Sequence, residues 1–174
     1  MQSTRRAETS EMEIFFTNEF FPYVNKLFSL QAERDHTYIA GLSMGGYGAL
    51  KLALLNPHIF SAAASLSGAV DVVSRMEKDP RWSEAERLIF GPPAKTKNTS
   101  CDLFYLAKNP VSHVYPRLYI TCGTEDFLYQ DNLRFRDVLA DSVYPFQFAC
   151  SQGVHDWNFW DVYIQKAIKF FIEK

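Results

Sequence analysis

The segment TYIAGLSMGGYGALKLALL occupies residues 37–55 and changes character in its middle. Thr37–Leu42 is a short β-type run, whereas Tyr47–Leu55 is rich in Ala and Leu, as helices are. Between them, residues 41–45 read GLSMG, which is the spacing G-x-S-x-G. A serine on a sharp strand-to-helix turn stands above the edge of a sheet, and small neighbours let strand and helix approach closely. We therefore predict a strand, a strained turn that exposes the Ser43 hydroxyl, and a helix. The alternative is a glycine-rich turn whose serine only caps the helix.

The rest of the chain alternates apolar β-type runs with helical segments. Further strands are expected at Phe60–Leu66, Arg117–Cys122 and Tyr144–Cys150. Helices are expected at Glu11–Phe28, Ser83–Ile89, Leu103–Lys108, Asn132–Ala140 and Asp156–Glu173. Pro22 interrupts the first of these, so either a helix begins near Thr17 with an early proline or a longer helix kinks there. This alternation indicates a parallel sheet with helical crossovers, and we predict that residues 1–174 form a single α/β domain.

Composition and charge exclude several classes of function. The chain has 18 Lys+Arg and 20 Asp+Glu, for a net charge of −2. It therefore has no excess of positive charge with which to bind nucleic acid or an anionic membrane. No apolar run approaches the roughly 18 residues of a membrane span, and the N-terminus lacks the order of a signal peptide. Cys101, Cys122 and Cys150 have no metal-binding spacing. Two of them lie in apolar runs, so we expect core thiols in a reducing compartment in place of a disulfide scaffold or a zinc site. These features predict a soluble cytoplasmic protein with no nucleic-acid and no membrane partner.

A serine nucleophile needs a base, and position relative to the strands separates the four histidines. In an open α/β sheet the site lies beyond the carboxyl ends of the strands. His36, His58 and His113 each precede a strand, which places them at the opposite end. Only His155, in the stretch GVHDW, follows a strand. We therefore predict that His155 is the base, with an ordinary loop histidine as the alternative.

The base in turn needs a carboxylate that fixes its orientation. Asp126 lies just past the third predicted strand, and its rivals are its neighbour Glu125 and Asp71, which follows the second. Asp126 is favoured because Ser43, Asp126 and His155 follow the chain order Ser…Asp…His. The alternative is a solvated loop acid that caps the next helix.

The last predicted helix places aromatic and aliphatic side chains on one face. These are Trp157, Trp160, Ile164, Ile168 and Phe171. A stripe at this spacing is usually core packing, which we expect for Trp160. Trp157 is two residues after His155 and could instead line a substrate pocket.

Several separated motifs give the chain a family resemblance. They are residues 41–50 (GLSMGGYGAL), 60–71 (FSAAASLSGAVD), 102–104 (DLF), 122–126 (CGTED) and 153–157 (GVHDW). Together they resemble the esterase D family of α/β-hydrolases, which includes tributyrin-type, acetyl and feruloyl esterases and S-formylglutathione hydrolases. The resemblance runs from about Phe16 to the C-terminus.

The resemblance implies hydrolysis of a small-molecule carboxylic ester or thioester through an acyl-enzyme, without a cofactor or a metal. It assigns Ser43 as nucleophile, Asp126 as acid and His155 as base. The backbone N–H of Met44, which follows the nucleophile, would be one donor of the oxyanion hole.

Compared with this family, the chain differs at its front. Family members carry several strands and a helix before the segment that corresponds to Glu11–Phe28, and a loop there supplies another oxyanion donor. We therefore expect the C-terminal part of an α/β-hydrolase fold, with about four parallel strands and a bare edge at Thr37–Leu42. Such a chain would be an oligomer or would be completed by an N-terminal segment. Three functions stay open: a serine carboxylesterase, an acyltransferase with the same triad, and an inactive hydrolase that acts as a binding or assembly domain.

Overall fold

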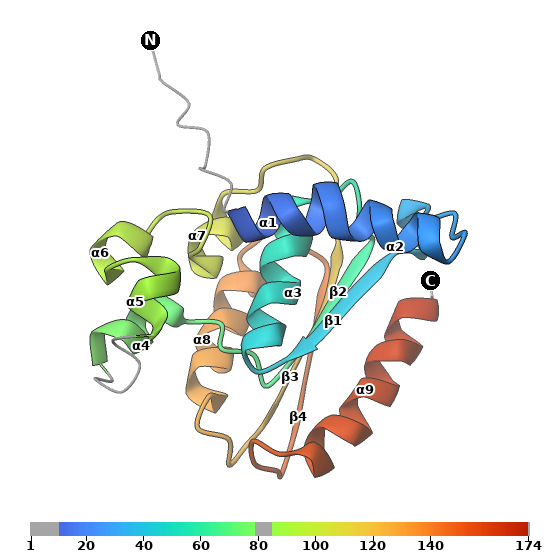
Figure 1. The fold of residues 1–174 in the computed structure, drawn as a ribbon. Helices are drawn as coiled ribbons and strands as arrows, with labels where there is room; N and C mark the ends of the chain where they lie inside the picture. The colour runs from blue at the N-terminus through green and yellow to red at the C-terminus, as the bar shows by residue number, and fades with distance from the viewer. Residues whose placement is uncertain (1–10, 79–84, 174) are drawn as a thin grey trace.

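A parallel sheet forms the centre of the computed structural model, which describes residues 11–78 and 85–173 (Figure 1). Its four strands lie in the order β1-β2-β3-β4, so neighbours in the sheet are also neighbours in sequence. The strands are β1 Tyr38–Leu42, β2 Ala62–Leu66, β3 Arg117–Gly123 and β4 Phe146–Ser151. All three pairings are parallel, and every connection is a crossover that contains a helix. The predicted α/β fold with about four parallel strands is confirmed.

Helices cover both faces of the sheet. Figure 1 shows α3, α7 and α8 on one face and α9 on the other. Their bounds are α3 Met44–Leu55, α7 Leu103–Lys108, α8 Tyr129–Ala140 and α9 Trp157–Ile172. The segment between β2 and α7 adds α4 Val72–Lys78, α5 Ala85–Phe90 and α6 Pro93–Thr96, and a short turn, η2 Arg34–His36, precedes β1. The sequence predicts neither α4 nor α6. The first two residues of the predicted helix Ser83–Ile89 lie outside the described part of the chain.

The first helix extends from Glu11 past Pro22 to Leu27. Of the two alternatives, a helix that begins near Thr17 and a longer one, the structure has the longer helix. It consists of α1 Glu11–Phe15, a π-helical turn η1 Phe16–Phe20 and α2 Phe21–Leu27. The Phe21 N–H donates to the Phe16 carbonyl, five residues back. Proline has no N–H, and its ring clashes with the carbonyl four residues earlier in a regular helix. The wider turn immediately before Pro22 relieves that clash without ending the helix.

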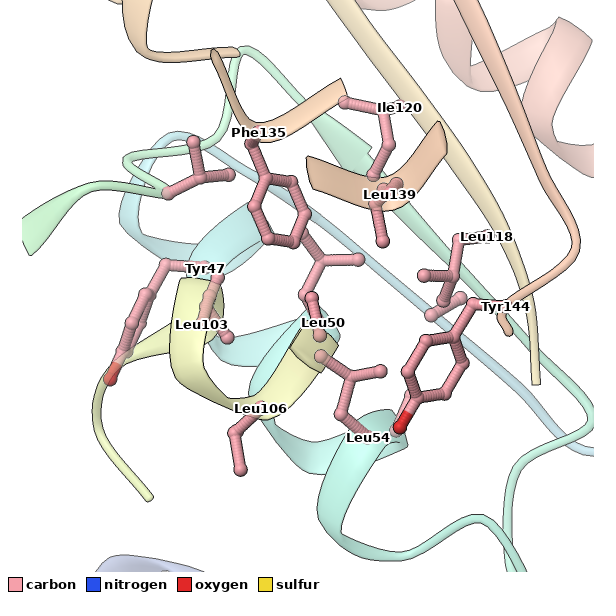
Figure 2. Packing of buried hydrophobic residues seen from close by; sticks show 14 of the residues in the cluster. Tyr47, Leu50, Leu54, Leu103, Leu106, Leu118, Ile120, Phe135, Leu139 and Tyr144 are labelled. Atoms are coloured by element: carbon pink, nitrogen blue, oxygen red, sulfur yellow. The ribbon is translucent and has the colours of Figure 1, made fainter. Parts of the chain in front are cut away.

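Two apolar clusters fill the space between the sheet and its helices. Along β3, Leu118 and Ile120 join the cluster under α3, α7 and α8, whereas Tyr119 joins the cluster under α9. This alternation is the period of two expected for a strand that is buried on both faces. The first cluster, drawn in Figure 2, includes Tyr47, Leu50, Leu54, Leu103, Leu106, Phe135, Leu139 and Tyr144.

The buried face of α9 differs in part from the predicted stripe. Trp160 and Phe171 are buried as predicted, but Trp157 is 71% exposed and Ile168 is 53% exposed. The remaining buried positions include Tyr163 and Ala167. Trp157 opens the helix at the carboxyl end of the sheet and packs edge-on against Trp160, with ring centroids 5.3 Å apart. Its other surface is therefore free to meet a ligand.

The outer edge of β1 is bare in the described part of the chain, where β1 pairs with β2 alone. Ala40 in the middle of the strand is exposed. Large apolar side chains are also exposed on the two helices that lie near this edge in Figure 1: Phe15, Phe20, Tyr23 and Leu27 on the first helix, with Phe28 directly after it, and Ile168 and Ile172 on α9. The expected bare edge is thus present and lies between apolar surfaces.

The junction of β1 and α3 gives a test of the fold. A Cβ atom on Gly41 would lie 2.2 Å from the carbonyl oxygen of Gly45, whereas a Cβ on Gly48 would have nothing within 4 Å. We expect Gly41→Ala to lower the free energy of unfolding by at least about 1–3 kcal/mol, as overpacking does. The control Gly48→Ala should be neutral or stabilising, because alanine is the better helix former. Urea unfolding followed by circular dichroism measures both, and equal stabilities would contradict the close approach.

Candidate functional site

Ser43 lies in the turn between β1 and α3 with an unusual backbone conformation. Its φ is 54° and its ψ is −121°, a region that residues other than glycine rarely adopt. The Ser43 N–H donates to the Leu66 carbonyl at 2.9 Å. The Ser43 carbonyl accepts from the N–H groups of Gly46, Tyr47 and Ala69 at 3.0, 3.2 and 3.1 Å. These bonds hold a conformation that by itself costs about 1–3 kcal/mol.

The structure brings Ser43, His155 and Asp126 into one hydrogen-bonded line. His155 Nδ1 is 2.8 Å from Asp126 Oδ2, and His155 Nε2 is 2.9 Å from Ser43 Oγ. A carboxylate only accepts hydrogen bonds, so Nδ1 carries the proton and donates to Asp126. Nε2 is then the acceptor, and the Ser43 hydroxyl donates to it. Of the histidines and acids considered from the sequence, these are the ones that meet.

Local structure fixes both partners of the serine. The Asp126 side chain is fully buried, and its Oδ1 accepts the Leu128 N–H at 2.8 Å. That bond closes a tight turn after β3 and leaves Oδ2 for the histidine. Asp156 caps α9 by accepting the Phe159 N–H at 3.0 Å, so His155 lies in the loop immediately before the helix.

The rival acids have other partners. Asp71 accepts the Ser74 N–H at 3.0 Å at the start of α4 and an Arg134 N–H at 2.9 Å. Glu125 is exposed and accepts from the Gln152 side chain at 3.0 Å. The other three histidines, His36, His58 and His113, are exposed and precede strands.

Two aromatic rings contact His155, and the sequence predicts neither contact. The Phe127 ring centroid is 4.7 Å from that of His155, and the Trp160 centroid is 4.9 Å from it, edge-on. Trp160 was expected only to pack in the core, and it does both. Phe127 has one sequence signal, its position directly after Asp126. Together the two rings restrict the orientations open to the imidazole.

An apolar cavity of about 290 Å³ lies between the edge strand β1 and α9. It is bounded by Ala40, Gly41 and Leu42 of β1, Leu66 of β2, and Trp157, Trp160, Asp161 and Ile164 of α9. Two of its lining residues are close to the hydrogen-bonded line: Leu42 precedes Ser43 in sequence, and the Trp160 ring contacts that of His155. Trp157, the pocket residue suggested by the sequence, is part of its wall.

Met44 is the first residue of α3. The first N–H groups of a helix have no partner within the helix, and the helix dipole adds partial positive charge there. The Met44 side chain borders a second cavity of about 610 Å³, between α3, the first helix and α5. The Met44 backbone is thus available to an anionic oxygen on Ser43.

The three cysteines differ in burial. All three are free, and burial, reinforced by the nearby charge of Asp126, raises the pKa of Cys122 well above that of an ordinary thiol. Cys122 therefore remains neutral behind the Asp126 loop. The prediction of core thiols is correct for Cys122 and wrong for Cys150, which is exposed on the edge strand β4.

Two further findings concern only residues 11–78 and 85–173. They contain no group of three or more His, Cys, Asp or Glu side chains arranged to hold a metal ion. Nor does any helix in these ranges have the length and apolar character that crossing a bilayer requires.

Known proteins match nearly the whole chain. The family model Esterase, described as "Putative esterase", matches residues 2–171. An acetyl esterase from Caldicellulosiruptor saccharolyticus is 31% identical over 165 residues, which are 90% of this chain and 62% of that protein.

Two solved structures from Staphylococcus aureus have the same fold over this length. The fluorophosphonate-binding serine hydrolase F is 37% identical with a TM-score of 0.80, over 91% of this chain and 63% of that one. S-formylglutathione hydrolase is 34% identical with a TM-score of 0.80, over 99% of this chain and 69% of that one. The chain therefore spans less than two thirds of the acetyl esterase and of the fluorophosphonate-binding hydrolase.

Proposed function

The chain belongs to the Esterase family, and on this premise we propose that it hydrolyses carboxylic esters through a covalent acyl-enzyme on Ser43. His155 is the general base and Asp126 is the acid that orients it. The observation that carries the proposal is the position of His155, with Nε2 2.9 Å from Ser43 Oγ and Nδ1 2.8 Å from Asp126 Oδ2. Both lengths suit proton transfer and orientation.

In the first half of the reaction, Ser43 Oγ attacks the acyl carbon while its proton passes to His155 Nε2. The carbonyl oxygen becomes an oxyanion, which the Met44 N–H stabilises at the start of α3. The positive imidazolium lies against the buried Asp126 carboxylate, which lowers the energy of that charged state. His155 then returns the proton to the leaving alkoxide or thiolate, and the acyl group stays on Ser43.

In the second half, His155 takes a proton from water as the water attacks the acyl-enzyme. Collapse of the second tetrahedral intermediate releases the carboxylic acid, and the proton returns to Ser43. An alcohol in place of water would give acyl transfer, and the partition of product between the two acceptors distinguishes a hydrolase from a transferase.

The substrate we propose is an ester or thioester of a short acyl chain. The cavity of about 290 Å³ between β1 and α9 is at the small end of ligand pockets, and its walls are mostly apolar. Trp157 closes one side of it and would contact the acyl group. Two relatives carry names that fit small acyl groups, an acetyl esterase and an S-formylglutathione hydrolase.

A fluorophosphonate probe tests the nucleophile. We expect stoichiometric labelling, with the adduct on Ser43 by mass spectrometry, because only a base-activated serine attacks such a probe readily. Ser43→Ala should lose both the label and p-nitrophenyl ester turnover while keeping its circular dichroism spectrum. The control Ser151→Ala, an exposed serine at the same end of the sheet, should keep both. Label on any residue other than Ser43 would overturn the proposal.

A second prediction concerns the acid. Asp126→Asn should retain the fold and lower kcat about 10⁴-fold, because the amide favours the wrong tautomer of His155. Glu125→Gln and Asp71→Asn remove the rival carboxylates and should lower kcat far less. Steady-state kinetics on purified variants measure all three. A larger loss in either rival variant would show that Asp126 is not the acid.

We further propose that the outer edge of β1 is covered in the functional protein, either by a second copy of the chain or by a strand from an additional N-terminal segment. Backbone N–H and C=O groups on an open edge form hydrogen bonds with any extended chain that reaches them. The exposed apolar side chains on the first helix and on α9 would be buried by the same contact.

Sedimentation tests this proposal on the 174-residue chain. We expect oligomers or aggregates, and Ala40→Lys should shift the distribution toward monomer because a charge on an edge strand opposes pairing. The matched control Gln147→Lys places the same charge on an exposed position of the opposite edge strand, β4, and should leave association unchanged. A chain that is monomeric at every concentration would contradict the proposal that the open β1 edge drives association.

A further inference from the structure

The turn that carries Asp126 depends on side chains outside it. Residues 124–127 lie between β3 and α8, and Phe127 is 61% exposed. Within the turn, the Asp126 N–H donates to the Gly123 carbonyl at 3.1 Å, and the Tyr129 N–H donates to the Asp126 carbonyl at 3.0 Å. The Thr124 and Glu125 N–H groups also donate to the Ser151 and Gly153 carbonyls at 2.9 and 3.0 Å, which ties the start of the turn to the segment before His155. The second half of the turn, at Phe127, needs a further contact from outside it.

Arg75 on α4 supplies such a contact. Its Nη2–H donates to the Phe127 carbonyl at 2.8 Å, and its Nε–H donates to Asp131 Oδ2 in the first turn of α8 at 2.5 Å. The guanidinium also lies over the Phe127 ring, 5.2 Å from its centroid. The side chains of Arg75 and Asp131 are only 15% and 11% exposed, so solvent screens this ion pair weakly. One planar guanidinium thus ties the turn to two helices.

The same residue reaches the imidazole through one ring. The Phe127 ring that lies under the Arg75 guanidinium also packs against His155, with centroids 4.7 Å apart. The Phe127 carbonyl that Arg75 binds is one residue beyond Asp126. Arg75 is therefore linked to both partners of the proposed nucleophile, Ser43. It is linked to Asp126 through the backbone of the turn and to His155 through the Phe127 ring.

We propose that Arg75 is a positioning residue that keeps the Asp126 carboxylate and the His155 imidazole aligned, an inference that rests on the proposed esterase mechanism. It touches neither the substrate nor the reacting atoms. Its effect arises because displacement of a catalytic group by about 1 Å costs on the order of 10²-fold in rate.

Arg134 provides a matched control in the same cluster of charges. It donates to Asp131 at 2.7 Å and to Asp71 at 2.9 Å, and to the Gln130 carbonyl at 3.3 Å. These contacts involve the same acid that Arg75 binds, but not the Phe127 carbonyl. Loss of Arg134 thus perturbs the ion pairs without releasing the Asp126 turn.

Kinetics and proton NMR on the full chain, in whatever assembly it forms, test the role of Arg75. Arg75→Met should lower kcat by about 10²-fold with a smaller change in KM, since alignment matters most in the transition state. Arg75→Lys retains the charge but not the planar fork, so it should recover part of the loss. Arg134→Met should lower thermal stability and leave kcat unchanged. Phe127→Leu alters an exposed side chain that leaves no buried charge unpaired, and it should lower kcat even if Arg75→Met fails to fold.

The NMR readout separates this inference from the proposed function. An imidazole N–H bonded to a carboxylate gives a proton resonance far downfield, which needs no turnover to be seen. We expect it in the unaltered chain and in Arg134→Met, and we expect it broadened or absent in Arg75→Met and Phe127→Leu. If the resonance and kcat both persist in folded Arg75→Met, the inference is wrong. If the unaltered chain neither labels at Ser43 nor turns over esters, the proposed function fails, while loss of the resonance in the variants would still support the positioning of His155 by Arg75.

Discussion

The contact between the backbones of Gly41 and Gly45 constrains everything around the candidate site. Strand β1 and helix α3 approach so closely that a single methyl group on Gly41 would overlap the Gly45 carbonyl. With no room for a wider loop, the chain reverses its direction at Ser43, which takes a positive φ. The hydrogen bonds of the Ser43 N–H and carbonyl to three segments of the chain hold this conformation. The conformation of Ser43 is thus a steric necessity, and its cost in conformational energy is offset by packing of the strand and the helix.

Parallel pairing of the strands extends this local turn into a site. Leu42 at the end of β1 pairs with Leu66, and Leu66 pairs with Thr121, so the carboxyl ends of the first three strands align. The chain leaves β3 toward Asp126 and leaves β4 toward His155 at the same edge. Residues that are far apart in sequence therefore meet without any long loop. This is the general reason that open α/β sheets form their sites at the carboxyl ends of strands.

The parts of the structure that local sequence determines are the parts that could be predicted. The four strands follow from short apolar runs, and the turn at Ser43 follows from glycine spacing. The predicted ends of the strands were less accurate where a single residue determines the end of the strand. β4 begins at Phe146 instead of Tyr144, because Pro145 cannot donate to the ladder and only its carbonyl accepts, from the Leu118 N–H. The rule that sites lie beyond the carboxyl ends of parallel strands also distinguished His155 from the other histidines, because the rule depends only on the order of strands and helices along the chain.

Contacts that depend on tertiary packing could not be read from the sequence. Neither spacing nor periodicity relates Arg75 to Phe127, or Phe127 to His155, because each pair joins separate elements whose side-chain directions are set by the fold. The same holds for Trp160, whose helical spacing predicts packing but not its contact with the imidazole. Exposure of Cys150 follows from its place on an edge strand, and the order of strands in the sheet was not available from an apolar run alone.

The bare edge of β1 and the apolar cavity share a boundary, which links assembly to substrate choice. Ala40, Gly41 and Leu42 form one wall of the cavity, and Trp157 and Ile164 of α9 form the opposite wall. A strand that pairs with β1 extends the sheet under α9 and so comes to lie along the open side of this cavity. Under the proposed esterase function, its side chains would limit the length of the acyl group that this cavity admits. Under the proposed function, covering this edge with a different strand would change the ester preference without any change in Ser43, Asp126 or His155. The cavity wall comes from residues within β1, whereas Ser43 lies in the turn after that strand and its two partners follow β3 and β4.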